Sequence, residues 1–132
     1  MPRIDDFLLA MVDKGGSDLH LCSELPPKIR VHGDLEPLDQ PPIPADEMER
    51  ILHEICPEDK WAWYQENRDQ DFAYEIRNVA RFRVNFMYNH FGPGAVMRII
   101  PTKILTLEDL HLPPVLSQVC EYPAGLVLVT GP

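Results

Sequence analysis

The most constraining feature of this 132-residue sequence is a change in the spacing of its apolar side chains after residue 67. Up to that point most apolar residues recur every three to four positions, and beyond it they recur at every second position. Successive side chains of a β-strand point to opposite faces of its sheet, so the second spacing is typical of strands. It predicts three strands, over 72–76, 82–88 and 95–100, which we expect to form an antiparallel meander.

Two arginines fall inside the second of these strands. Arg81 and Arg83 alternate there with the apolar residues Phe82, Val84 and Phe86. Because the apolar side chains require a core, both guanidinium groups are expected on the opposite, unburied face. The surrounding residues 76–107 contain no carboxylate but carry five basic residues: Arg77, Arg81, Arg83, Arg98 and Lys103. Two interpretations stay open, a site for a small anion and a solvated face that forms weak surface ion pairs.

Other elements follow from helical spacing, prolines and short alternating runs. A helix is predicted over 2–14, and two short strands over 17–23 and 28–32. Pro44 and Pro57 each begin a further helix, because proline fixes φ at a value suited to a first turn. A last short helix is expected over 113–121, and the aromatic residues around 61–72 are interpreted as core.

The net charge excludes one class of partner. The formal charge is −9, and residues 1–66 hold 15 acids and six bases. Duplex DNA is bound through a broad basic face, so no nucleic-acid partner is expected. No apolar run reaches the roughly 18 residues of a membrane span, and Asp5 and Asp6 stand where a signal peptide is basic. We therefore expect no membrane insertion and no secretion.

The end of the sequence is a continuous apolar run bounded by glycines, GLVLVTGP at 125–132. Such a run is typical of a strand buried on both faces in a parallel sheet. A strand that leads into Thr-Gly is also how a phosphate-binding loop of the G-x-x-x-x-G-K-[ST] type begins. Gly131 would be the first glycine of that loop, and Gly131 and Pro132 are therefore candidate nucleotide-binding residues.

A second candidate constellation is the pair Asp18 and His20, which share one face of the strand over 17–23. A carboxylate and an imidazole at this spacing suit a metal or an acid–base pair, but no third ligand is spaced to help. A structural histidine is the favoured interpretation. The three cysteines, Cys22, Cys56 and Cys120, have no metal-knuckle spacing and are interpreted as reduced, buried thiols. No metal site is expected within these residues.

Five blocks of sequence resemble one family. They are GSDLHL at 16–21, LPPKIRVHG at 25–33, VARFRVN at 79–85, RIIP at 98–101 and GLVLVTGP at 125–132. In this order and spacing they resemble the N-terminal domain of PilT-type twitching-motility ATPases, in the type II/IV secretion ATPase superfamily. The resemblance covers nearly the whole chain. The short stretch before Ser17 favours retraction motors over assembly motors, and leaves PilT-like and PilU-like branches open.

The resemblance implies an α+β fold: a PAS-like domain with a mainly antiparallel sheet flanked by helices, ending in the first strand of a RecA-like ATPase domain. The expected boundaries are 1–111 for the PAS-like domain, 112–124 for a helical linker and 125–132 for the truncated ATPase domain. Arginines of this domain approach the nucleotide phosphates in the family, and they correspond here to Arg81, Arg83 and Arg98. These are the candidate catalytic residues.

The function implied is ATP hydrolysis by a homohexamer that powers type IV pilus retraction, with ATP and Mg²⁺ as cofactors of the full-length protein. Implied partners are the pilus inner-membrane platform protein and related pilus ATPases, at a cytoplasmic site peripheral to the inner membrane. The family's loop lysine and catalytic glutamate are not among these residues, so this chain alone is expected to bind nucleotide weakly and to be inactive. The alternative is a stand-alone PAS-like sensory or protein-interaction module.

Overall fold

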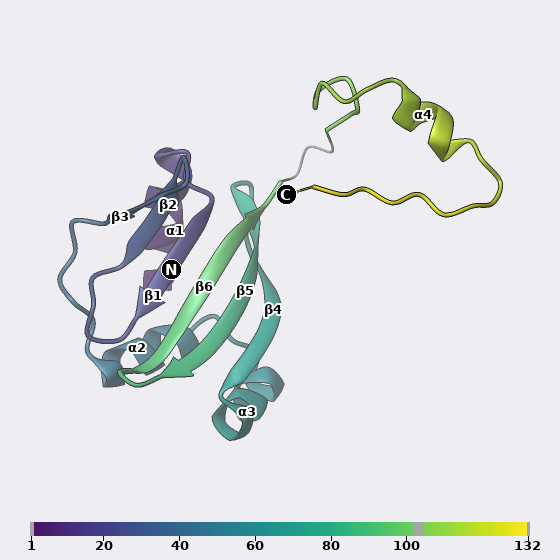
Figure 1. The fold of residues 1–132 in the computed structure, drawn as a ribbon. Helices are drawn as coiled ribbons and strands as arrows, with labels where there is room; N and C mark the ends of the chain where they lie inside the picture. The colour runs from purple at the N-terminus through teal and green to yellow at the C-terminus, as the bar shows by residue number, and fades with distance from the viewer. Residues whose placement is uncertain (1, 102–104, 132) are drawn as a thin grey trace. The chain divides into compact units, whose positions relative to one another are not determined.

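A six-stranded antiparallel sheet organises the first part of the chain (Figure 1). The computed structural model describes residues 2–101 and 105–131, and the chain divides into two units, Met1–Thr102 and Lys103–Pro132. The strand order in the first unit is β3-β2-β1-β6-β5-β4, and every neighbouring pair is antiparallel. The strands are β1 (Asp18–Cys22), β2 (Lys28–Val31), β3 (Asp34–Pro37), β4 (Asp69–Ile76), β5 (Ala80–Asn89) and β6 (Gly92–Ile100).

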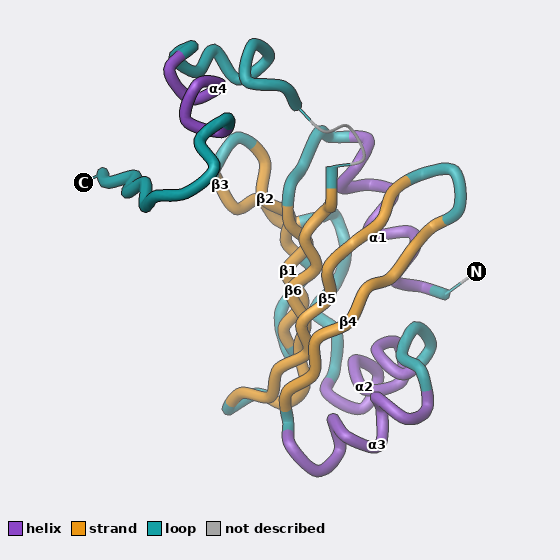
Figure 2. Tube along the Cα trace, turned by 90° about the vertical axis from the view of Figure 1, so that its right-hand side faces the viewer, coloured by secondary structure: helices purple, strands orange, loops and turns teal. Residues whose placement is uncertain are grey.

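Three helices cover one face of this sheet (Figure 2). They are α1 (Arg3–Asp13), α2 (Ala45–His53) and α3 (Glu58–Asn67). Each is preceded by a proline, at Pro2, Pro44 and Pro57, with φ between −59° and −55°. Each also has two acidic residues in its first turn, which complement the positive end of the helix dipole. Local sequence therefore determines where these helices begin, and all three confirm the prediction.

The core lies between the helices and the inner face of the sheet. Its strand residues alternate with exposed ones, as the spacing of two predicts. The fully buried members include Ile4, Leu8 and Met11 from α1, Met48 and Leu52 from α2, and Leu19, Ile29, Phe82, Val84, Phe86 and Met97 from the strands. Burial of this apolar surface is the main favourable term in folding. The α+β class and the antiparallel arrangement of the sheet are as predicted.

Strand β3 was not expected from the sequence. All four of its residues are exposed, so it has no alternating apolar pattern to detect. A two-residue turn joins it to β2, with His32 at φ 49° and Gly33 at φ 97°. Positive φ at both central residues is typical of a tight hairpin turn, and the His-Gly pair is the sequence signal for it.

The second unit is described by itself and contains one short helix, α4 (Val115–Cys120). Residues 125–131 are assigned no strand, although their sequence predicts one. A strand is stabilised by hydrogen bonds to a neighbour, and none of the described residues pairs with this run. Leu126 and Val129 are 83% and 90% exposed. The apolar side chains of the run are therefore uncovered in this structure.

The cysteines are free, but only Cys56 is buried; Cys22 is half-buried and Cys120 is exposed, which corrects the expectation for those two. Burial raises the pKa of the Cys56 thiol to about 11, so it stays protonated at neutral pH. In the part of the chain that the structure describes, no three acidic, histidine or cysteine side chains gather as metal ligands. None of the helices there has both the length and the apolar character needed to cross a bilayer.

Candidate functional site

The sheet face opposite the three helices, called here the outer face, gathers the three predicted arginines. Arg83 on β5 is the direct register partner of Arg98 on β6. Arg81 lies two residues from Arg83 on the same face, opposite Ile100. The side chains of Arg83 and Arg98 are 72% and 71% exposed. The structure therefore places Arg81 and Arg83 on one face, as the strand spacing predicts, and adds Arg98 to that face through the register of β5 with β6. Their contact with phosphate stays a prediction.

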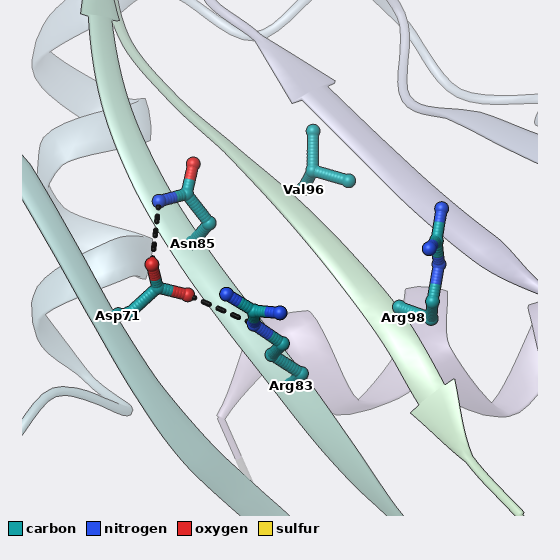
Figure 3. Close-up of a pocket in the computed structure, with 5 residues that line it drawn as sticks. All are labelled: Asp71, Arg83, Asn85, Val96 and Arg98. Carbon is teal, nitrogen blue, oxygen red and sulfur yellow. Dashed lines mark hydrogen bonds and ion pairs between the residues drawn. The ribbon is translucent and has the colours of Figure 1, made fainter. Parts of the chain in front are cut away.

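A shallow pocket of about 280 Å³ lies on this face (Figure 3). We call it the arginine pocket; its lining residues are Asp71, Arg83, Asn85, Val96 and Arg98. Three neighbouring strands supply them, β4, β5 and β6. Val96 lies on β6 as the register partner of Asn85, to one side of the two arginines in the close-up, and gives the pocket an apolar lining. Two guanidinium groups side by side on neighbouring strands are a donor set that suits a compact anion with several oxygens.

Arg83 is held by an exposed carboxylate on the neighbouring strand. Its Nε donates to Asp71 Oδ1 at 3.2 Å, and Asn85 Nδ2 donates to Asp71 Oδ2 at 3.4 Å. Asn85 Nδ2 also donates to Asp69 Oδ1 at 3.1 Å. The side chain of Asp71 is 49% exposed. An ion pair this exposed contributes little to stability and can be exchanged for another anion at small cost.

Arg98 is held instead by a buried carboxylate. Its Nε donates to Asp18 Oδ1 at 2.6 Å, and the side chain of Asp18 is only 3% exposed. Ser17 Oγ donates to Asp18 Oδ2 at 2.7 Å, and Arg30 Nε lies 3.6 Å from that oxygen. Burial by itself raises the pKa of Asp18, but the hydrogen bonds from Ser17 and Arg98 outweigh it, and the pKa lies below its ordinary value.

Arg81 differs from the other two arginines. It faces Glu75 in the register of β4 and β5, yet it forms no ion pair with any residue described here. It lines a separate hollow of about 320 Å³ beside the β4–β5 turn. Of the two candidate nucleotide-binding residues, Gly131 belongs to the second unit, which is described by itself, and Pro132 lies outside the described residues. Their role stays a prediction.

The engagement of Asp18 by two arginines supports the structural interpretation of the Asp18 and His20 pair. Burial lowers the pKa of His20, and the positive charge of Arg30 lowers it further, more than Asp18 raises it. His20 Nε2 is buried and has no hydrogen-bond partner among the described residues. Lys28 is its register partner on β2. A proton on His20 would thus add a further positive charge to a basic neighbourhood.

Acidification should therefore destabilise the fold through His20. Because the folded pKa is below the ordinary 6.5, the stabilising contribution is present above pH 6.5 and is lost as the pH falls through the folded pKa. Thermal unfolding of the chain at about pH 7.5 and about pH 5.5 measures this, and His20→Gln should reduce the loss of stability between them. The exposed His90→Gln is the control. An unchanged pH dependence in His20→Gln would contradict the assignment.

Sequence reasoning missed the partners that hold the arginines. Asp18 and Arg98 are 80 residues apart in the sequence, and only the register of β1 with β6 brings them together. Arg30, which approaches the same carboxylate from β2, lies outside the acid-free stretch. Asp71 lies opposite Asn85 and next to Arg83. Finding these partners requires the order and register of the strands, and the alternation of apolar residues along one strand carries no information about either.

Comparison with known proteins finds no family model that matches the chain. It does find relatives. The chain is 41% identical over 129 residues to the type IV pilus retractation ATPase PilT of Pseudomonas aeruginosa. The solved structure of the pilus retraction motor PilT with bound ADP matches 96% of the chain at a TM-score of 0.80 and 32% identity. The chain belongs with the N-terminal regions of the PilT-type ATPases.

A second curated relative agrees with this assignment, and a more distant solved structure shares the fold. The chain is 34% identical over 129 residues to the type IV pilus ATPase PilU of Pseudomonas aeruginosa, below its identity to PilT. The Legionella pneumophila ATPase DotB shares the fold, with a TM-score of 0.69 at 23% identity over 87% of the chain. The chain spans 38% of the length of PilT and 34% of the length of PilU. It therefore corresponds to roughly the first third of a PilT-type protein.

Proposed function

We propose that this chain is the N-terminal domain of a hexameric ATPase that powers type IV pilus retraction, and that Arg81, Arg83 and Arg98 approach the phosphates of ATP. The single observation that carries the proposal is the direct register pairing of Arg83 with Arg98 on an exposed face. Each arginine is paired through its Nε, Arg83 with Asp71 and Arg98 with Asp18, and the two arginine side chains stay 72% and 71% exposed. A bound phosphate chain would accept hydrogen bonds from the exposed sides of both guanidinium groups at once.

The chemistry of the site fits a phosphate. The guanidinium fork donates two parallel hydrogen bonds to an oxyanion, and hydrogen bonds to charged groups contribute roughly 1.5–3 kcal/mol each. In phosphoryl transfer, cations placed at the phosphates stabilise charge that develops in the transition state. ATP would supply the transferred phosphoryl group, and an accompanying Mg²⁺ would supply further positive charge for the transfer. Arg83 and Arg98 would bind and orient the phosphates from the side of this domain.

The proposal includes the domain organisation expected from the sequence. In the full-length protein residues 1–111 would form the N-terminal domain, 112–124 a helical linker and 125–132 the first strand of the ATPase domain. The arginine-bearing domain would move against the ATPase domain as nucleotide binds and leaves. Its place would be the cytoplasmic side of the inner membrane at the pilus base, with the platform protein and related pilus ATPases as partners. The higher identity to PilT than to PilU supports a PilT-like motor.

Nucleotide affinity of the full-length protein tests the site. Arg98→Ala should weaken the affinity for ADP about tenfold, measured by titration calorimetry, because one charge-assisted hydrogen bond is lost. Arg50→Ala is the matched control: Arg50 is an exposed arginine of α2 and pairs with Asp46. If both variants bound ADP as tightly as the wild type, Arg98 would not contact the nucleotide.

The 132-residue chain by itself provides a further prediction. It should release no phosphate from ATP, because the loop lysine that contacts the β- and γ-phosphates is absent from these residues. Arginines without that backbone cradle should bind ATP only weakly. A colorimetric phosphate assay and a calorimetric titration measure both. A submicromolar dissociation constant for ATP would instead favour a PAS-like sensory module with a nucleotide site of its own.

A further inference from the structure

The two arginines of the arginine pocket are held in different ways. Arg83 pairs with Asp71, whose side chain is 49% exposed, and Arg98 pairs with Asp18, whose side chain is 3% exposed. In Figure 3 the Arg83 guanidinium is drawn toward Asp71 on the β4 side, away from Arg98. One carboxylate can therefore leave its arginine for solvent, and the other cannot leave without breaking a buried network.

Asp18 has both carboxylate oxygens engaged. Oδ1 accepts the 2.6 Å hydrogen bond from Arg98, and Oδ2 accepts the 2.7 Å hydrogen bond from Ser17. Arg30 flanks the carboxylate from β2, and its Nη1 also donates to the carbonyl oxygen of Gly33 at 2.6 Å. A buried charge with satisfied oxygens is costly to displace, because it would leave unpaired charges behind. Asp18 therefore fixes the Nε of Arg98.

Because Asp18 binds Arg98 through Nε alone, the N–H donors of the two terminal nitrogens stay available. The terminal nitrogens of Arg98 form no hydrogen bond with any of the described residues, and the side chain stays 71% exposed. An arginine that is already ordered loses less conformational entropy when it binds a ligand. The arrangement provides Arg98 with a pre-set orientation at the pocket, whereas Arg83 must exchange Asp71 for the ligand.

We propose that Asp18 is a positioning residue: it holds Arg98 in the orientation that receives a phosphate-bearing anion, whereas Asp71 competes with that anion for Arg83. This rests on the proposed function of the arginines. The two carboxylates thus act in opposite directions on the same site, although both carry one negative charge near it.

The test compares the effects of removing each carboxylate on anion binding. Asp18→Asn and Asp71→Asn each remove one negative charge from the 132-residue chain, so charge alone predicts tighter anion binding in both. The positioning role predicts opposite signs: Asp71→Asn binds inorganic pyrophosphate about two- to tenfold more tightly, and Asp18→Asn about two- to tenfold more weakly. Titrations followed by NMR of the arginine Nε–H groups measure this into the millimolar range. The Arg98 Nε–H should be protected from exchange in the wild type and lose that protection only in Asp18→Asn.

Controls distinguish a failure of the positioning role of Asp18 from a failure of the phosphate site itself. Thermal unfolding reports whether each variant is folded. Ser17→Ala keeps every charge and removes one hydrogen bond to Asp18, so it should also weaken pyrophosphate binding. If Asp18→Asn does not fold, Ser17→Ala tests the positioning role in its place. Tighter binding in Asp18→Asn, or unchanged binding in Ser17→Ala, overturns the positioning role while Arg98→Ala still shows weaker binding. Absence of any pyrophosphate response in the wild type, or wild-type binding in Arg98→Ala, overturns the proposed phosphate site itself.

Discussion

Replacing Arg83 by alanine should lower ATP turnover of the full-length protein about tenfold or more, because a charge-assisted hydrogen bond to phosphate is worth roughly 1.5–3 kcal/mol. The fold should survive, since the Arg83 side chain is 72% exposed and its ion pair with Asp71 lies at the surface. Steady-state phosphate release measures the effect. Size-exclusion chromatography of the same sample shows whether the assembly is intact.

Lysine at the same position refines this expectation. Arg83→Lys keeps the charge but loses the planar fork, so it should recover only part of the lost turnover. Arg50→Ala, on the helical side of the sheet, should turn over like the wild type. Full activity in both Arg83 variants would show that Arg83 is an ordinary surface residue. It would favour the alternative that this domain is a protein-interaction module.

Removal of the Phe86 ring should cause a large loss of stability, about 3–5 kcal/mol. Phe86 is completely buried, and three other rings surround it: Phe72 at 5.1 Å, Tyr64 at 5.4 Å and Trp61 at 6.3 Å between centroids. These contacts join α3 to strands β4 and β5. Phe86→Ala would leave a cavity that neighbouring rings cannot fill without moving from their positions. Urea unfolding of the chain measures the change.

The matched control is another phenylalanine close by. Phe91 lies in the turn after β5, and its side chain is 55% exposed. Phe91→Ala should change the free energy of unfolding by less than about 0.5 kcal/mol. Similar unfolding midpoints for the two variants would show that the aromatic cluster does not hold α3 on the sheet.

The period of two explains why the fold was largely predictable. It identified the faces of β5, and with them the common side of Arg81 and Arg83, from local spacing alone. The starts of α1, α2 and α3 were equally local, because a proline and two acidic residues mark each one. Strand β3 was not predicted because none of its side chains is buried, and an exposed edge strand has no alternating apolar pattern.

The candidate site was predictable only in part, for a different physical reason. Spacing places Arg98 on a strand but does not indicate which strand lies beside it. The pairing of Asp18 with Arg98, and of Asp71 with Arg83, depends on sheet order and register, which arise from packing of the whole chain. The run over 125–131 illustrates the same limit, because its strand-like sequence has no hydrogen-bonding neighbour among the described residues.

The strand order also determines which backbone edges of the sheet a second copy of this domain could pair with. An open sheet ends in two strands with unpaired backbone groups, which can recruit a strand of another molecule and start aggregation. Here those strands are β3 and β4, and both are acidic: β3 carries Asp34 and Glu36 and ends at Pro37, while β4 carries Asp69, Asp71 and Glu75. Two such edges repel each other, and proline supplies no N–H for pairing. The sheet is therefore protected against growing sideways into a fibril.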